Sequence, residues 1–154
     1  MPAVYVDTSA LVKRYVGKIG TIWVRRLLAR PVRQAIYTAL LAQTEVLSAL
    51  QRKVRDGTLT VAEAQRLARR VQRHCAHRYR LVAITPARVT QANALVQAHP
   101  LRAYDALHLA CALAVRDALQ PYGLPAPRFI TADNALLAAA RAEGFVVDNP
   151  LKHP

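Results

Sequence analysis

Short runs of β-branched and aromatic residues alternate along this chain with longer segments in which apolar residues recur every three or four positions. The short runs predict strands at residues 4–6, 34–37, 81–84, 129–131 and 145–147. The longer segments predict helices at residues 10–16, 21–29, 38–55, 60–79, 86–98, 102–119 and 134–143. This order predicts an α/β fold with a central parallel sheet of about five short strands, flanked by helices.

Capping residues and turn formers define where several of these elements begin and end. Thr38 is placed to cap the helix that runs to residue 55, and Pro31 to close the helix before it. Thr60 and Glu63 form a capping box at the start of the next helix, and a turn at residues 56–57 joins the two long helices. Together these two helices predict a protruding helical hairpin.

Length and composition predict one folded domain over residues 1–154. Hydrophobic residues make up 53% of the chain and charged residues 20%, which is typical of a globular protein. The start lacks the pattern of a signal peptide, and the longest apolar run, residues 107–115, is too short to cross a bilayer. With 2 cysteines and no CxxC pair, we expect a cytoplasmic protein that does not bind a membrane.

The net charge changes the picture from a generic α/β domain to one that attracts polyanions. Lys and Arg number 22 against 9 Asp and Glu, so the net charge is +13 and the isoelectric point about 10.9. Such a charge favours nucleic acid as a partner. A genome-wide preference for arginine would give the same composition, and basic composition alone does not distinguish the two.

Four acidic residues stand out against this basic background. Asp7 and Asp133 follow strands and Asp105 lies just inside a helix, positions where each could also be an ordinary N-cap or complement the helix dipole. Glu45 is the only charged residue in residues 37–50, so it lies on a largely buried helix. A buried carboxylate needs a partner, because its unpaired burial is unfavourable.

The local sequence offers these acids no basic partner, since their short motifs (YVDTSA, QTEVL, AYDALHLA and ITADNA) contain no Arg or Lys. In a parallel sheet such segments converge beyond the carboxyl ends of the strands. Four converging carboxylates would repel one another unless a divalent cation such as Mg²⁺ or Mn²⁺ is bound. Such a cation supports phosphodiester cleavage, and a basic rim would attract the substrate backbone.

At these residues the chain resembles the PIN-domain ribonucleases of the VapC toxin type. The matching motifs are VYVDTSALVK at residues 4–13, Glu45, YDALHLA at 104–110 and FITADN at 129–134, followed by Gly144-Phe145 and Asn149-Pro150. They span nearly the whole chain in the order and spacing typical of that family. Each motif alone is weak evidence for the family, whereas four motifs in the same order and spacing are strong evidence.

The resemblance implies a PIN-like fold and a metal-dependent endoribonuclease that cleaves structured cellular RNA. It implies that Asp7 and Asp105 bind Mg²⁺ or Mn²⁺ directly and that Glu45 and Asp133 complete the catalytic cluster. Supporting contacts to the carboxylates or to metal-bound water would come from Thr8, Ser9, Thr131 and Asn134. The implied partners are a VapB-like antitoxin, which keeps the toxin silent, and a second copy of the chain.

Other side chains have competing interpretations. Four basic residues lie opposite the apolar face of their helix: Arg66, Arg69, Arg70 and Arg73. They form either an RNA-binding surface or a helix face that is merely solvated. His108, one turn after Asp105, suits either an orienting donor or a buried, hydrogen-bonded histidine. Residues 74–77 contain two histidines and Cys75, but Cys75 lies on the apolar stripe, which favours core packing over zinc.

Two other classes of function remain open from the sequence. The first is a catalytically silent, basic nucleic-acid-binding module in which the four acids are only helix caps; it would need no metal. The second is a metal-dependent phosphatase on an α/β scaffold, which is disfavoured because Asp7 is followed by Thr8 and Ser9 instead of a second aspartate two residues on.

Overall fold

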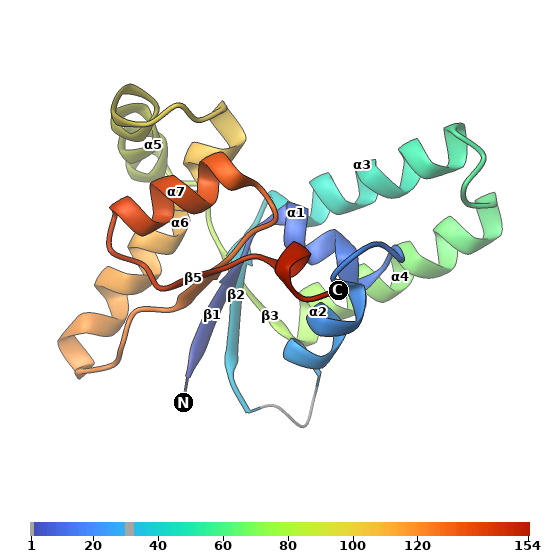
Figure 1. Cartoon of the computed structure of the whole chain (residues 1–154), viewed down its shortest axis with the longest axis horizontal. Helices are drawn as coiled ribbons and strands as arrows, with labels where there is room; N and C mark the ends of the chain where they lie inside the picture. The colour runs from blue at the N-terminus through green and yellow to red at the C-terminus, as the bar shows by residue number, and fades with distance from the viewer. Residues whose placement is uncertain (1, 30–32) are drawn as a thin grey trace.

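A five-stranded parallel sheet forms the centre of the protein, in a computed structural model that describes residues 2–29 and 33–154 (Figure 1). Its strand order is β3-β2-β1-β4-β5, and every neighbouring pair is parallel. The strands are β1 (Ala3–Val6), β2 (Ala35–Ala39), β3 (Tyr79–Val82), β4 (Arg128–Ile130) and β5 (Val147–Asp148). The predicted α/β fold with a parallel sheet is therefore confirmed.

The strand order reverses at β1. From β1 the chain adds β2 and β3 on one side of the sheet, then crosses over and adds β4 and β5 on the other. In such sheets a crevice opens beyond the carboxyl ends of the two strands at the reversal, here β1 and β4. Asp7 directly follows β1, and Asp133 comes three residues after the end of β4, so the topology alone brings these two acids to one crevice.

Helices cover both faces of the sheet, because alternate residues of a strand point to opposite sides. Val4 and Val6 of β1 pack into one core cluster, and Tyr5 into the other. The first face is covered by α1 (Thr8–Leu11), α2 (Thr21–Leu27), α3 (Ala42–Arg55) and α4 (Val61–His77). The second is covered by α5 (Pro86–Ala98), α6 (Ala103–Leu119) and α7 (Asn134–Ala142).

The helices α3 and α4 form the predicted hairpin, which extends well beyond the sheet (Figure 1). The capping box at its second helix is present: the Thr60 side chain accepts from the Glu63 amide at 3.1 Å, and the Thr60 amide donates to Glu63 at 2.9 Å. Val46, Leu50, Val71 and Cys75 of the hairpin are buried in the first core cluster. Core packing of Cys75 is thereby confirmed.

Several element boundaries differ from the predictions. The first helix begins at Thr8 and continues as a 3₁₀ turn at Val12–Arg14, instead of running over residues 10–16. Thr38 does not cap α3; it lies in β2, where its buried hydroxyl donates to the Val6 carbonyl at 2.6 Å. The helix predicted to reach residue 79 ends at His77, because Tyr79 pairs with Ile36 at the start of β3. The predicted stop at Pro31 lies outside the described residues.

The last strand is also shifted, since β5 comprises Val147–Asp148 and not residues 145–147. Phe145 instead packs into the second core cluster, with its ring 5.8 Å from that of Phe129. Among the helices that the structure describes, we find none that is both long and apolar enough to span a membrane.

The C-terminal segment packs against the region around α2. A 3₁₀ turn at Pro150–Lys152 brings His153 onto Trp23, with the rings stacked 4.3 Å apart. Gly20 lies beside this turn in a left-handed conformation (φ 87°), and a side chain there would overlap the Pro150 backbone. Glycine is therefore required at this position both for its conformation and for its size.

Candidate active site

All four acidic residues singled out from the sequence line one hollow of about 360 Å³. They come from four separate elements: Asp7 caps α1, Glu45 lies in the first turn of α3, Asp105 in that of α6, and Asp133 caps α7. The same hollow is lined by Thr8, Ser9, Arg52, Arg102, Tyr104 and His108. The fold thus gathers the predicted acids on one surface.

Asp7 is the most buried of the four acids, with 2% of its surface exposed. Its carboxylate accepts hydrogen bonds from the Ser9 hydroxyl (2.8 and 2.9 Å), the Thr131 hydroxyl (2.8 Å) and the Ala10 amide (3.0 Å). Burial raises the pKa of Asp7, while His108 and these hydrogen bonds act in the opposite direction. The carboxylate is held in one orientation, in surroundings that oppose its negative charge unless a cation is near.

Two side chains orient the carboxylate of Glu45. Its Oε1 accepts from the Thr8 hydroxyl at 2.9 Å and lies 2.9 Å from His108 Nε2. The other ring nitrogen of His108 lies 2.9 Å from the hydroxyl of buried Tyr5. Both interpretations of His108 therefore hold, because the ring is buried and also orients an acidic residue of the hollow.

Asp105 and Asp133 share an arginine, which contradicts the expectation that these acids lack a basic neighbour. Arg102 Nε lies 3.5 Å from Asp105, and its Nη2 lies 3.6 Å from Asp133. Burial raises the pKa of Asp105, and the charge of Asp133 raises it further, whereas Arg102 and His108 lower it. The Arg102 side chain is 85% exposed, so it reaches the two carboxylates from the solvent side.

The residues of the hollow fit a divalent cation chemically. Carboxylate oxygens are the ligand atoms that Mg²⁺ and Mn²⁺ prefer. Two of the four carboxylates, those of Asp105 and Asp133, already share a positive charge, the guanidinium of Arg102. Within residues 2–29 and 33–154, however, no three His, Cys, Asp or Glu side chains stand close enough together to form a ready-made metal cluster. A cation at this position would require these side chains to move closer together and Arg102 to leave Asp105 and Asp133.

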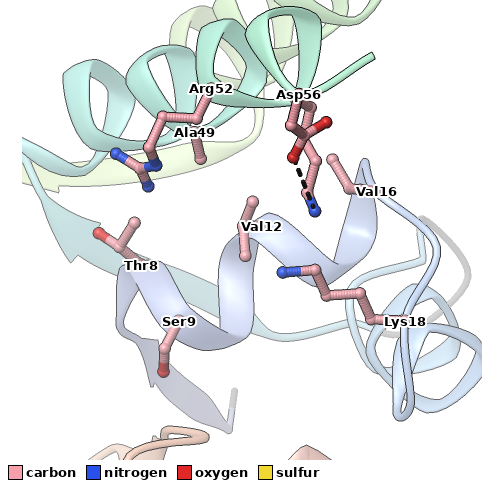
Figure 2. A pocket seen from close by; sticks show the side chains of 9 residues that line it. Thr8, Ser9, Val12, Val16, Lys18, Ala49, Arg52 and Asp56 are labelled. Carbon is pink, nitrogen blue, oxygen red and sulfur yellow. Dashed lines mark ion pairs between the residues drawn. The ribbon is translucent and has the colours of Figure 1, made fainter. Parts of the chain in front are cut away.

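A second hollow continues from this site along the groove between α1 and α3 (Figure 2). Figure 2 shows Arg52 reaching from α3 toward Thr8 on α1, and both residues line the two hollows. Farther along, Lys18 lies beside the ion pair of Lys53 and Asp56, which are 3.8 Å apart. Basic side chains therefore line this groove as far as the hollow that contains the carboxylates.

The remaining predicted residues lie outside the hollow. Asn134 is exposed, and its side chain accepts from Asn149 at 3.4 Å instead of contacting an acid. The four predicted RNA-binding arginines are exposed on α4, where Arg70 and Arg73 line one hollow and Arg66 another. None of the four lines the hollow of the carboxylates.

Sequence reasoning missed three residues that line the site: Arg52, Arg102 and Tyr104. Arg102 could have been found, because it lies three residues before Asp105, on the same side of a helix start. Tyr104 also had a signal, as an aromatic residue beside an acid at a helix start; its side chain is 62% exposed. Arg52 also had a signal, because it lies seven residues after Glu45, on the same face of one helix.

Comparison with known proteins gives a consistent family. Residues 4–142 match the family model described as "PIN domain". The chain is 37% identical over 117 residues to "Ribonuclease VapC45" and, equally, to "Ribonuclease VapC49", from two strains of Mycobacterium tuberculosis. Each alignment covers 76% of this chain and 79% of the relative.

Two solved structures share the fold at low sequence identity. One, a toxin–antitoxin complex from Klebsiella pneumoniae, has a TM-score of 0.57 and 18% identity, covering 96% of this chain and 98% of the other. The other, FitAcB from Neisseria gonorrhoeae, has a TM-score of 0.60 and 13% identity, covering 96% and 97%. The architecture described above is therefore shared by both.

Proposed function

This chain belongs to the PIN-domain family and is related to the VapC ribonucleases, and we propose that it is a Mg²⁺- or Mn²⁺-dependent endoribonuclease, the toxin of a toxin–antitoxin pair. The observation that carries the proposal is the convergence of Asp7, Glu45, Asp105 and Asp133, from four separate elements, on one hollow. The topology of the sheet brings only Asp7 and Asp133 together, whereas Glu45 and Asp105 lie inside helices, cap neither of them, and still line the same hollow. The substrate proposed is structured cellular RNA, encountered in the cytoplasm.

In this proposal the four carboxylates hold the cation, with Asp7 and Asp105 as its direct ligands. When bound, the cation supplies the positive charge that activates water and stabilises the phosphate in the transition state. Ser9 and Thr131 keep the Asp7 carboxylate in its orientation, and Thr8 and His108 do the same for Glu45. Arg102 is released from Asp105 and Asp133 as the metal binds.

Two further side chains of the hollow suit the RNA strand. The Arg52 guanidinium projects over Thr8, where it can hydrogen-bond a phosphate beside the scissile one. The exposed ring of Tyr104 offers a face on which an unpaired base can stack. These residues position the strand and take no part in proton transfer.

Removing the metal tests the proposed function. We expect RNA cleavage in Mn²⁺ or Mg²⁺, none in excess EDTA, and recovery when the ion is restored. Binding has a second readout: a metal ion at ten times its dissociation constant adds about 1.4 kcal/mol of stability, or roughly 2–5 °C in melting temperature. Cleavage that persists in EDTA, or a protein that binds RNA but never cuts it and shows no metal-induced shift, would favour the silent binding module.

Replacing Arg52 with Gln tests the role proposed for the groove. We expect KM for RNA to rise about tenfold, because the variant cannot form the charge-assisted hydrogen bond to phosphate, with kcat within about twofold. Arg55→Gln is the matched control, since Arg55 is exposed on the same helix and does not line the hollows. An equal rise in KM for both variants would show that only the overall charge matters.

We also propose an antitoxin partner and a homodimer. The solved structures of similar fold include a toxin–antitoxin complex, and Arg102 shows that a guanidinium can occupy the space between Asp105 and Asp133. A VapB-like antitoxin would offer an Arg or Lys to these carboxylates and an acidic stretch to the basic surface around them. Co-purification with the product of the neighbouring gene, together with the mass of the free protein by light scattering, would check both.

A further inference from the structure

A third hollow, of about 380 Å³, is lined only by basic and imidazole side chains. Its lining residues are Arg14, Arg70, Arg73, His74, His77 and Arg78. It lies at the junction of α4 and β3. Tyr79, which directly follows Arg78, pairs with Ile36 of β2, and Ile36 in turn pairs with Val4 of β1. Asp7 lies beyond the other end of β1, so this basic hollow is separate from the carboxylate site.

The basic hollow is built from positioned side chains. Arg14 is only 8% exposed, and its Nη1 donates to the Tyr79 hydroxyl at 2.9 Å. Arg78 Nη2 donates to the Leu28 carbonyl at 3.3 Å, while its buried Nε has no hydrogen-bond partner among the described residues. His74 Nδ1 lies 2.8 Å from the Tyr15 hydroxyl. These contacts hold the positive groups together before any ligand arrives.

No carboxylate balances these charges. Within the described part of the chain, no Asp or Glu forms an ion pair with Arg14, Arg70, Arg73 or Arg78. Burial, and after it the charges of these four arginines, lower the pKa of His74 to about 4. The arginine contribution reflects a positive potential at this position, and such a potential favours an anion in the same space.

We propose that the basic hollow binds a phosphate group in the backbone of a nucleic acid, at a second contact point away from the carboxylates. Guanidinium groups match phosphate oxygens in pairs, and the Nε of Arg78 is a donor without a partner among the described residues. The lining contains no apolar side chain to anchor a peptide, which favours phosphate over an acidic protein segment. The contact does not depend on catalysis, so a silent nucleic-acid-binding protein would use it as well.

The test compares two double variants with the same reduction in charge. Arg70→Gln/Arg73→Gln removes two exposed arginines of the basic hollow, and Arg66→Gln/Arg69→Gln removes two exposed arginines of the same helix outside it. Binding of a fluorescent single-stranded RNA is measured in EDTA, over a range of salt concentrations. We expect the affinity of the first variant to fall at least about tenfold. The slope of log affinity against log salt concentration should become shallower by about 0.7, the value for the one phosphate that is no longer neutralised. The affinity of the control should fall less than about threefold.

A second measurement locates the anion. Inorganic phosphate should shift the ring signals of His74 and His77 in NMR spectra, while His99 and His153, which pair with Glu143 and Asp148, stay unchanged. Equal reductions of RNA affinity in the two double variants, or no phosphate-induced shift at His74, would overturn the proposed site. A response to inorganic phosphate without any selective reduction of RNA affinity would overturn its assignment to a nucleic-acid strand, as would stronger competition by poly-glutamate than by RNA.

Discussion

Replacing Asp7 with Asn is expected to abolish RNA cleavage while leaving the protein folded. The substitution keeps an oxygen for the Ala10 amide but removes the charge proposed to bind the cation directly. Losing several kcal/mol of transition-state stabilisation corresponds to a fall in rate on the order of a thousandfold. Because burial opposes the Asp7 charge and raises its pKa, the metal-free variant should melt no lower than the wild type. Initial cleavage rates and thermal melts in EDTA measure the two effects.

The matched control for this prediction is Asp117→Asn. Asp117 lies on α6 like Asp105, but it is exposed and pairs with Arg116 at 3.3 Å, outside the hollow. Its replacement should leave the cleavage rate within about twofold and the melting temperature nearly unchanged. Wild-type cleavage by the Asp7 variant would remove Asp7 from the catalytic cluster.

Replacing Gly20 with Ala should produce a large loss of stability. The left-handed conformation at φ 87° costs about 1–2 kcal/mol for a residue with a side chain. The new methyl group would also overlap the Pro150 carbonyl, whose carbon would lie only 2.8 Å away, adding about 1–3 kcal/mol of overpacking. The sum of roughly 2–5 kcal/mol corresponds to a fall in melting temperature on the order of 5–15 °C.

Gly57→Ala separates these two causes. Gly57 has a similar φ of 80°, but nothing lies within 4 Å of a side chain built there. This variant should lose only the conformational part, about 1–2 kcal/mol. If the two variants destabilise the protein equally, the close approach of Pro150 to Gly20 does not contribute, and the C-terminal turn is more loosely held than its stacking of His153 on Trp23 indicates.

The order of elements could be predicted from the sequence because periodicity reports which residues face the core. The errors arose where two tendencies conflict in one residue. Thr38 is a good N-cap by composition, but it is also β-branched, and burial against Val6 makes it a strand residue. Tyr79 is a second such residue, because its sequence context also suits the end of a helix, whereas in the structure it is the first residue of β3. Whether such a residue belongs to a helix or a strand depends on tertiary packing, which a local sequence pattern does not describe.

The candidate site was predicted less evenly than the fold. The four acids could be selected because carboxylates at strand ends and on a buried helix are unusual, and the structure places all four at one hollow. Their partners were harder to foresee. The contact of His108 with Tyr5 joins residues 103 positions apart, and Arg102 reaches Asp133 as well as its neighbour Asp105. Contacts of this kind depend on how whole elements pack and leave no trace in a short motif.

The hydrogen bonds at His108 fix more than its position. Its two ring nitrogens have different partners, Glu45 Oε1 at Nε2 and the Tyr5 hydroxyl at Nδ1, each at 2.9 Å. A 180° flip of the ring would break both contacts, so they hold the ring in one orientation between Tyr5 of β1 and Glu45. Strand β1 is therefore connected to Glu45 through two buried side chains, Tyr5 and His108, and a change in core packing around Tyr5 is expected to alter the direction of the Glu45 carboxylate.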